Sequence, residues 1–116
     1  MSNLDHEKIG REFAELVNMS AGEIEDWLST ENSRAVGWKG QDGKARESVG
    51  HASGRRIAEI LRKRKQQRTA EDYTHMRKVV GFVRRHLAQR PENIYTSRWR
   101  YSLMNWGHDP VKEDRR

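Results

Sequence analysis

The sequence contains no cysteine, only two prolines and no long run of apolar residues. Without cysteine, the chain can form no disulfide, no thiolate nucleophile and no cysteine-ligated zinc site. No segment has the length and apolarity of a membrane span, and the first residues are too polar for a signal peptide. We therefore expect a soluble, cytoplasmic protein that does not bind membranes.

The composition predicts one small domain with a lean core. The length of 116 residues is that of a single domain. Apolar and charged residues each make up 34% of the sequence, so few side chains are available for the interior. Four Trp, three Tyr and two Phe compensate in part, because each ring buries a large apolar area. We expect a compact domain over residues 1–110 and a frayed basic tail over 111–116.

Acidic residues are scarce in the second part of the chain. Residues 1–47 carry 6 basic and 10 acidic side chains, a net charge of −4, whereas residues 48–116 carry 17 basic and 7 acidic ones, a net charge of +10. A strongly basic segment favours a polyanionic partner such as nucleic acid. Attraction between the two parts of the chain is the alternative explanation.

Helical periodicity predicts four to five helices and no strand. The expected helices cover about residues 5–18, 20–28, 69–90 and 97–106, and a third one in chain order starts between 48 and 53 and ends near 67. Ser20 and Thr69 each begin a capping box, with Glu23 and Asp72 three residues further on. Pro91 disfavours helix at the residue before it. The expected fold is all-α.

A Gly-rich loop is expected between the second and third helices. Gly37, Gly40 and Gly43 recur there among charged residues, and no apolar periodicity crosses them. Trp38 lies within this loop, where its ring either pins the loop to the core or is presented to a partner. We expect pinning.

The fourth helix carries a basic stripe opposite its apolar side. At about 100° per residue, Arg77, Lys78, Arg84 and Arg85 cluster around Gly81. A glycine inside a helix costs about 1 kcal/mol of helix stability relative to alanine. We therefore expect a compensating contact, in which a neighbouring group approaches the helix closely at Gly81. Either another helix or a phosphate backbone could make that approach, and we expect the helix.

Further cations and one aromatic ring extend the candidate surface. The candidate nucleic-acid-binding residues outside the stripe are Arg62, Lys63, Arg64, Lys65, Arg98, Arg100 and Tyr101. Arginine grips phosphate through paired hydrogen bonds, and a tyrosine ring can stack on a base. Cations also stabilise a helix C-terminus, so the run at 62–65 has a structural explanation as well.

No arrangement of residues indicates catalysis or metal binding. His75 and His86 share a side of the fourth helix, but they are about 16 Å apart along it, too far to share a metal ion. Ser53 has no base or orienting residue that the sequence identifies. We expect no enzyme activity, no metal and no cofactor, with a site around His51 and Trp38 as the outside alternative.

Three segments form a recognisable set: 48–57 (SVGHASGRRI), 72–81 (DYTHMRKVVG) and 98–110 (RWRYSLMNWGHDP). Together they resemble a family of small proteins from bacteria and some fungi that is classed as a domain of unknown function. The similarity extends from about residue 13 to 110. Members are sometimes labelled DNA-binding proteins, so the resemblance implies one defined domain and, more loosely, DNA binding. It implies no catalytic residues.

These observations predict a small helical DNA-binding or nucleoid-associated protein. It would contact mainly phosphates and select sequence weakly, because no recognition-helix pattern stands out. Duplex DNA is favoured over RNA. With about five phosphate contacts, the logarithm of the binding constant would fall with the logarithm of the salt concentration at a slope of about −4 to −5. The alternative is a protein-interaction module or homodimer whose basic face binds an acidic partner.

Overall fold

The computed structural model describes residues 3–114, which form seven α-helices, one 3-10 turn and no strand. In chain order the elements are α1 (Asn3–Leu16), α2 (Ala21–Leu28), α3 (Glu31–Ala35), α4 (Val49–Arg62), η1 (Lys65–Gln67), α5 (Ala70–Leu87), α6 (Arg98–Asn105) and α7 (Pro110–Asp114). The all-α prediction is confirmed. The short helices α3 and α7 were not predicted from the sequence.

Side-chain caps determine where four of the helices begin. Ser20 and Thr69 form the two predicted capping boxes, in which the cap hydroxyl and the carboxylate three residues on each accept a backbone N–H. Ser48 and Ser97 cap α4 and α6 through their hydroxyl groups. Such caps stabilise a helix by about 1 kcal/mol. The four helices therefore begin where the sequence predicts.

Helix α4 ends about five residues earlier than predicted. It stops at Arg62, and the backbone of Lys63 is extended. The ammonium group of Lys63 lies 2.7 Å from the carboxylate of Asp72, which is only 4% exposed. Burial of a carboxylate requires a partner, so we attribute the early end to this pair and to the repulsion among four consecutive cations.

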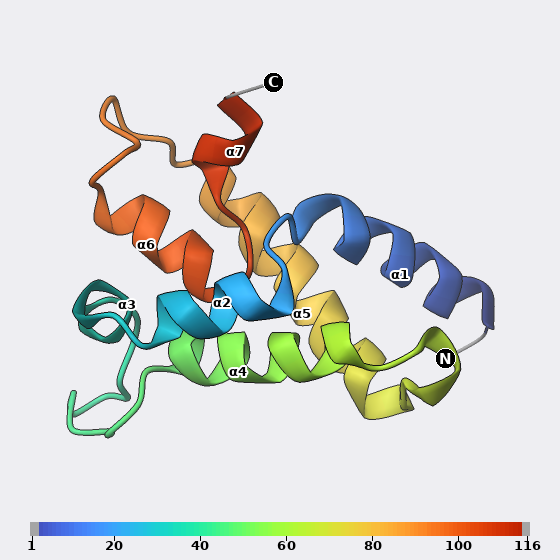
Figure 1. Ribbon diagram of the computed structural model, residues 1–116. Helices are drawn as coiled ribbons and strands as arrows, with labels where there is room; N and C mark the ends of the chain where they lie inside the picture. Colours follow the sequence, from blue (N-terminus) through green and yellow to red (C-terminus); the bar gives the residue numbers. More distant parts are fainter. Residues whose placement is uncertain (1–2, 115–116) are drawn as a thin grey trace.

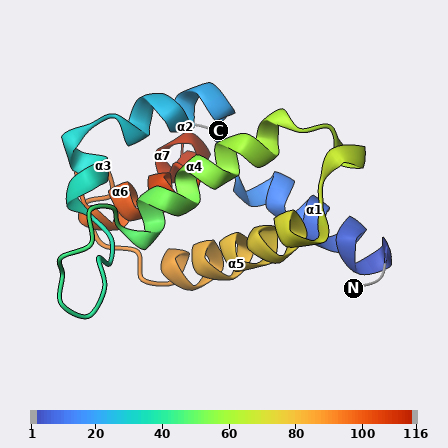
Figure 2. The ribbon, with the colours of Figure 1, turned by 90° about the horizontal axis from the view of Figure 1, so that it is seen from below.

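The helices pack in two groups around one core. Helix α1 lies along α5, while α2 lies along α4, with α6 and α3 next to it (Figure 1). The view from below shows the chain through η1 linking the end of α4 to the start of α5 (Figure 2). The most deeply buried apolar side chains come from α2, α4, α5 and α6 and join the two groups: Ile24, Ile57, Ile60, Met76, Val79, Val83 and Leu103.

Asn105 of α6 links three helices in the interior. Its Oδ1 accepts hydrogen bonds from Nε1 of Trp27 at 2.7 Å and from the hydroxyl of Ser33 at 2.6 Å. Its Nδ2 donates to the Ser33 carbonyl at 3.0 Å. Helix α6 approaches α4 at Gly54, where a Cβ atom would lie 2.6 Å from the Asn105 carbonyl oxygen. Only glycine fits this crossing without movement of the helices.

The end of the described chain packs onto the domain. Val111 of α7 is buried, and Lys112 donates to the Asn18 carbonyl at 3.0 Å and pairs with Glu23 at 2.7 Å. Residues 115–116 of the tail that we expected to fray lie outside the described part. None of the described helices has the length and apolarity that crossing a membrane requires.

Candidate functional site

The outward side of α5 carries three cations around a glycine. Arg77, Lys78, Gly81 and Arg85 form what we call the α5 basic face. The three cations are exposed, and none of them forms an ion pair with the described residues. Lys78 and Arg85 are about 10 Å apart along the helix axis. The sequence predicted this grouping, and α5 presents it to solvent.

No other helix covers Gly81. A Cβ atom at this position would meet only the guanidinium of Arg85, whose Nη1 lies 3.0 Å away. Helix α1 runs beside the face, and a shallow hollow between α1 and α5 reaches Gly81 from one side. The expected explanation, a helix packed over Gly81, is therefore wrong. Close approach of a phosphate backbone stays a prediction.

On α4, on α5 and in their connection, three of the candidate cations are held by carboxylates within the fold. Arg84 pairs with Glu12 of α1 at 2.6 Å, and Arg62 pairs with Glu25 of α2 at 2.6 Å. Lys63 is bound to Asp72, as described above. These pairs hold α1 on α5, α2 on α4 and the α4–α5 connection. They also satisfy part of the attraction between the acidic and basic parts of the chain.

The candidates on α6 have contacts within the domain as well. Arg100 binds Asp109 through two nitrogens, at 3.1 and 3.2 Å, and donates to the Tyr95 carbonyl at 2.7 Å. The Tyr101 ring is tilted against Trp27, with 5.4 Å between the ring centroids. Arg98 is exposed and donates to a carbonyl of α3 at 3.3 Å. Arg100 and Tyr101 thus stabilise the α6 region.

Arg64 and Lys65 lie in the connection between α4 and α5. Both are exposed, and neither side chain forms an ion pair with the described residues. Lys65 borders a hollow of about 870 Å³ between α1, η1 and the start of α5. Phe13 and Tyr73 contribute rings to this hollow, so aromatic and cationic groups meet there.

Ser53 and His75 form a contact that the sequence did not reveal. The Ser53 hydroxyl lies 2.9 Å from Nε2 of His75, across the α4–α5 contact. Burial lowers the pKa of His75, and the charges of Arg56 and Lys78 lower it further. Ser53 is only 4% exposed, and no described carboxylate hydrogen-bonds to His75. The pair therefore lacks the exposed nucleophile and the orienting group of a hydrolytic site, and it fastens α4 to α5.

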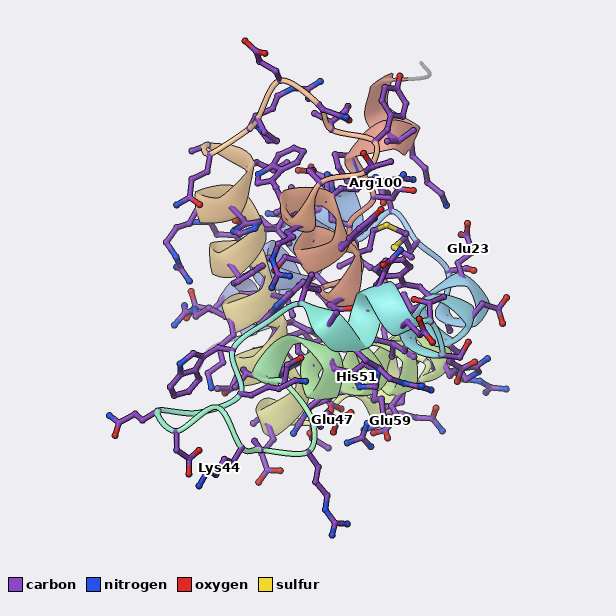
Figure 3. The ribbon with its side chains drawn as sticks, turned by 90° about the vertical axis from the view of Figure 1, so that its left-hand side faces the viewer. Glu23, Lys44, Glu47, His51, Glu59 and Arg100 are labelled. Atoms are coloured by element: carbon purple, nitrogen blue, oxygen red, sulfur yellow. The ribbon has the colours of Figure 1, made fainter. Side chains whose placement is uncertain are left out.

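Glu47 anchors the loop that precedes α4. Its carboxylate binds Arg55 at 2.5 Å and the Nδ1 atom of His51, and Figure 3 shows Glu47 and His51 side by side. Nε2 of His51 donates to the Leu28 carbonyl at 2.8 Å. The hydrogen bond from Arg55, followed by that from His51, lowers the pKa of Glu47 to about 2. Both ring nitrogens of His51 are thus engaged within the fold.

Trp38 is not pinned to the core. Its side chain is 62% exposed, so the expectation of pinning is wrong. The ring belongs to residues 37–47, which we call the Trp38 loop. Gly37, Gly40 and Gly43 of this loop all have positive φ, a conformation that glycine adopts without strain. The loop therefore has a defined backbone and presents an aromatic ring to solvent.

The segments that carry the family resemblance build the framework. In segment 48–57, a Cβ atom at Gly50 would lie 3.0 Å from Nε1 of Trp106, and one at Gly54 would lie 2.6 Å from the Asn105 carbonyl oxygen, so the backbone passes close to the end of α6 at both positions. In segment 98–110, His108 is buried and its Nδ1 donates to the Leu16 carbonyl at 2.6 Å. Tight packing and buried hydrogen bonds explain these residues without reference to a ligand.

The comparisons identify a family for this chain and no known activity. No curated protein and no solved structure matches the chain. A family model described as "Protein of unknown function (DUF3140)" matches residues 12–104. This range contains all of α2 to α5, most of α6 and the last five residues of α1. Because the match covers most of the chain, the protein belongs to this family, DUF3140.

Proposed function

We propose that this protein binds nucleic acid, duplex DNA above all, through phosphate contacts from the α5 basic face. One observation carries the proposal: Arg77, Lys78 and Arg85 are exposed, have no carboxylate partner among the described residues, and surround an uncovered glycine. Exposed cations that a fold does not neutralise attract a polyanion. The DNA-binding label that the family resemblance implies points in the same direction. We propose a cytoplasmic location as part of the same function.

The arrangement favours contacts to the backbone over contacts to bases. A side chain at position 81 would hold a phosphate strand away from the helix, and glycine removes this obstacle. The face lacks the Asn and Gln side chains that read adenine edges in the major groove. We therefore propose weak sequence selectivity. With three cations in contact, the salt slope would be about −3, since each phosphate contributes about −0.9.

This slope is shallower than the −4 to −5 that five contacts would give. The difference arises because Arg84 and Arg62 are paired with Glu12 and Glu25. Binding that broke these pairs would have to offset the loss of the internal contacts. We therefore assign the first contacts to the three unpaired cations of the α5 basic face.

The experiment compares two double variants of equal charge. Arg77→Gln/Arg85→Gln removes two cations of the α5 basic face, and Arg11→Gln/Arg34→Gln removes two other exposed arginines, on α1 and α3. Affinities for duplex DNA, single-stranded DNA and RNA are measured at one low salt concentration. We expect the first variant to lose duplex affinity at least tenfold and the second to remain close to wild type. Equal affinities for both variants would refute the proposed face.

A second candidate function is self-association or binding of an acidic protein. The Arg84–Glu12 and Arg62–Glu25 pairs favour it, because they show that the acidic and basic parts of this chain fit one another. In a dimer, such pairs could form between two copies. Gel filtration at low and high salt without DNA is the test: a dimer that dissociates with salt supports this function, and a monomer under both conditions excludes self-association.

A further inference from the structure

Trp38 differs from the other three tryptophans in its surroundings. Trp99 and Trp106 are 9% and 8% exposed, and Nε1 of Trp27 is hydrogen-bonded to Asn105. Trp38 is 62% exposed. The ring therefore does not contribute to the core as the others do, and a large apolar surface is left in contact with water, which is unfavourable.

The backbone around Trp38 is fixed, so its exposure is built into the fold. Gly37 has a φ of 98°, and a Cβ atom there would lie 2.8 Å from the hydroxyl oxygen of Ser48. The Trp38 carbonyl accepts from the N–H of Val49, the first residue of α4, at 2.9 Å. Within the loop, the N–H of Ala45 donates to the Lys39 carbonyl at 3.2 Å. The chain thus holds the tryptophan at a defined position outside the core.

Three cations lie in the same loop as the Trp38 ring. Lys39, Lys44 and Arg46 belong to the same loop, and none of them forms an ion pair with the described residues. Lys44 lies far out on the loop in Figure 3. The carboxylate of Asp42 is engaged within the loop, because it accepts a hydrogen bond from the backbone N–H of Lys44 at 3.0 Å. The segment therefore combines one exposed ring with a positive charge.

The loop adjoins the end of α5. Val36 and Gly37 line a shallow hollow together with His86 and Gln89, which follow Arg85 of the α5 basic face. A strand of nucleic acid that leaves the face at its C-terminal end therefore comes close to the start of the Trp38 loop. This continuity favours the same ligand for both surfaces.

We propose that Trp38 stacks on an unpaired base of a nucleic acid while Lys39, Lys44 and Arg46 contact the adjoining phosphates. An exposed ring among cations is the combination by which proteins hold single strands, because every base has an aromatic surface and every linkage a charge. The site would accept any base and would require it to be unstacked. This inference rests on the proposed function and adds to it a preference for DNA with unpaired positions.

The experiment uses tryptophan fluorescence and a short oligothymidylate, which has no duplex structure. Wild-type protein should show quenching, because the solvent-exposed ring is the one that a base can reach. Trp38→Ala should weaken binding of the oligothymidylate about tenfold or more, within the range known for base–aromatic stacking. Trp38→Phe should retain most of the affinity, since it keeps a ring. Tyr95→Ala is the matched control, because Tyr95 is 58% exposed in a different loop, and it should bind like wild type.

The outcomes separate this inference from the proposed function. If wild type and Trp38→Ala bind the oligothymidylate equally, or if binding leaves the Trp38 fluorescence unchanged, the stacking site is refuted. Duplex binding that depends on Arg77 and Arg85 would then still stand. Loss of duplex binding in Trp38→Ala to the same extent as oligothymidylate binding would also overturn the inference, because it would show no preference for unpaired bases.

Discussion

The same substitution, glycine to alanine, is expected to have opposite effects at two helix interiors. At Gly54 of α4, a Cβ atom would lie 2.6 Å from the Asn105 carbonyl oxygen and 2.9 Å from Cδ2 of Leu28. Because the first contact is with backbone, α4 and α6 must move apart, and overpacking of this kind costs about 1–3 kcal/mol. At Gly81 of α5, the only neighbour within 4 Å is the mobile end of Arg85. Alanine there should stabilise the helix by about 0.5–1 kcal/mol.

Thermal unfolding followed by circular dichroism measures both changes. For a domain of 116 residues, the usual unfolding entropy converts 1 kcal/mol into about 4 °C of Tm. We expect Gly81→Ala to raise Tm by about 2–4 °C and Gly54→Ala to lower it by about 4–12 °C. A decrease of Tm in Gly81→Ala would show that something packs over this glycine. That result would refute the assignment of Gly81 to an open surface.

Further changes test the framework and the face separately. The pKa of Glu47 is lowered to about 2, so its ion pairs stabilise the fold above about pH 4.5, and this stabilisation is lost as the pH falls towards 2. In Glu47→Gln, the free energy of unfolding measured with urea should therefore change less between pH 4.5 and 2 than it does in the wild type. Asn105→Ala leaves two buried donors unpaired and should cost about 2–4 kcal/mol in urea unfolding. Arg84→Gln breaks the ion pair between the exposed Arg84 and the half-buried Glu12, so it should cost about 1 kcal/mol and leave duplex affinity nearly unchanged. Gly81→Leu should leave the protein folded but weaken duplex binding, because the leucine side chain would hold the phosphates away from the helix. Fluorescence anisotropy with labelled duplex measures this affinity, and undiminished binding would contradict a close approach of the phosphate backbone to Gly81.

The helix starts were predictable because their signals are local. Ser20 and Thr69 specify capping within three residues, and no distant contact has to be known. The end of α4 was not predictable in this way. It depends on the contact of Lys63 with Asp72, which is nine residues away and buried by the fold. Boundaries set by tertiary contacts are therefore the ones that the sequence analysis missed.

The candidate site was predictable in part for the same reason. Arg77, Lys78 and Arg85 share a side of one helix, so helical geometry alone brings them together. The partner of Arg84 is Glu12, 72 positions earlier in the chain, and the partner of Ser53 is His75, on another helix. Neither pairing leaves a pattern in the sequence.

The exposure of Trp38 could not be predicted from the sequence for a different reason. An aromatic residue between glycines can fold onto the core or away from it, and composition does not distinguish the two. At the start of the loop, Gly37 lies so close to the side chain of Ser48 that a Cβ atom would not fit there. Only the three-dimensional path of the loop shows that the ring faces outwards.

The most direct test of phosphate binding by the α5 basic face is the salt dependence of duplex DNA affinity. For the wild type we expect a log–log slope of about −3, and for Arg77→Gln/Arg85→Gln a slope of about −1, since each lost phosphate contact removes about 0.9. Arg11→Gln/Arg34→Gln should keep the wild-type slope. A wild-type affinity that does not change with salt, or equal slopes for all three proteins, would contradict the account.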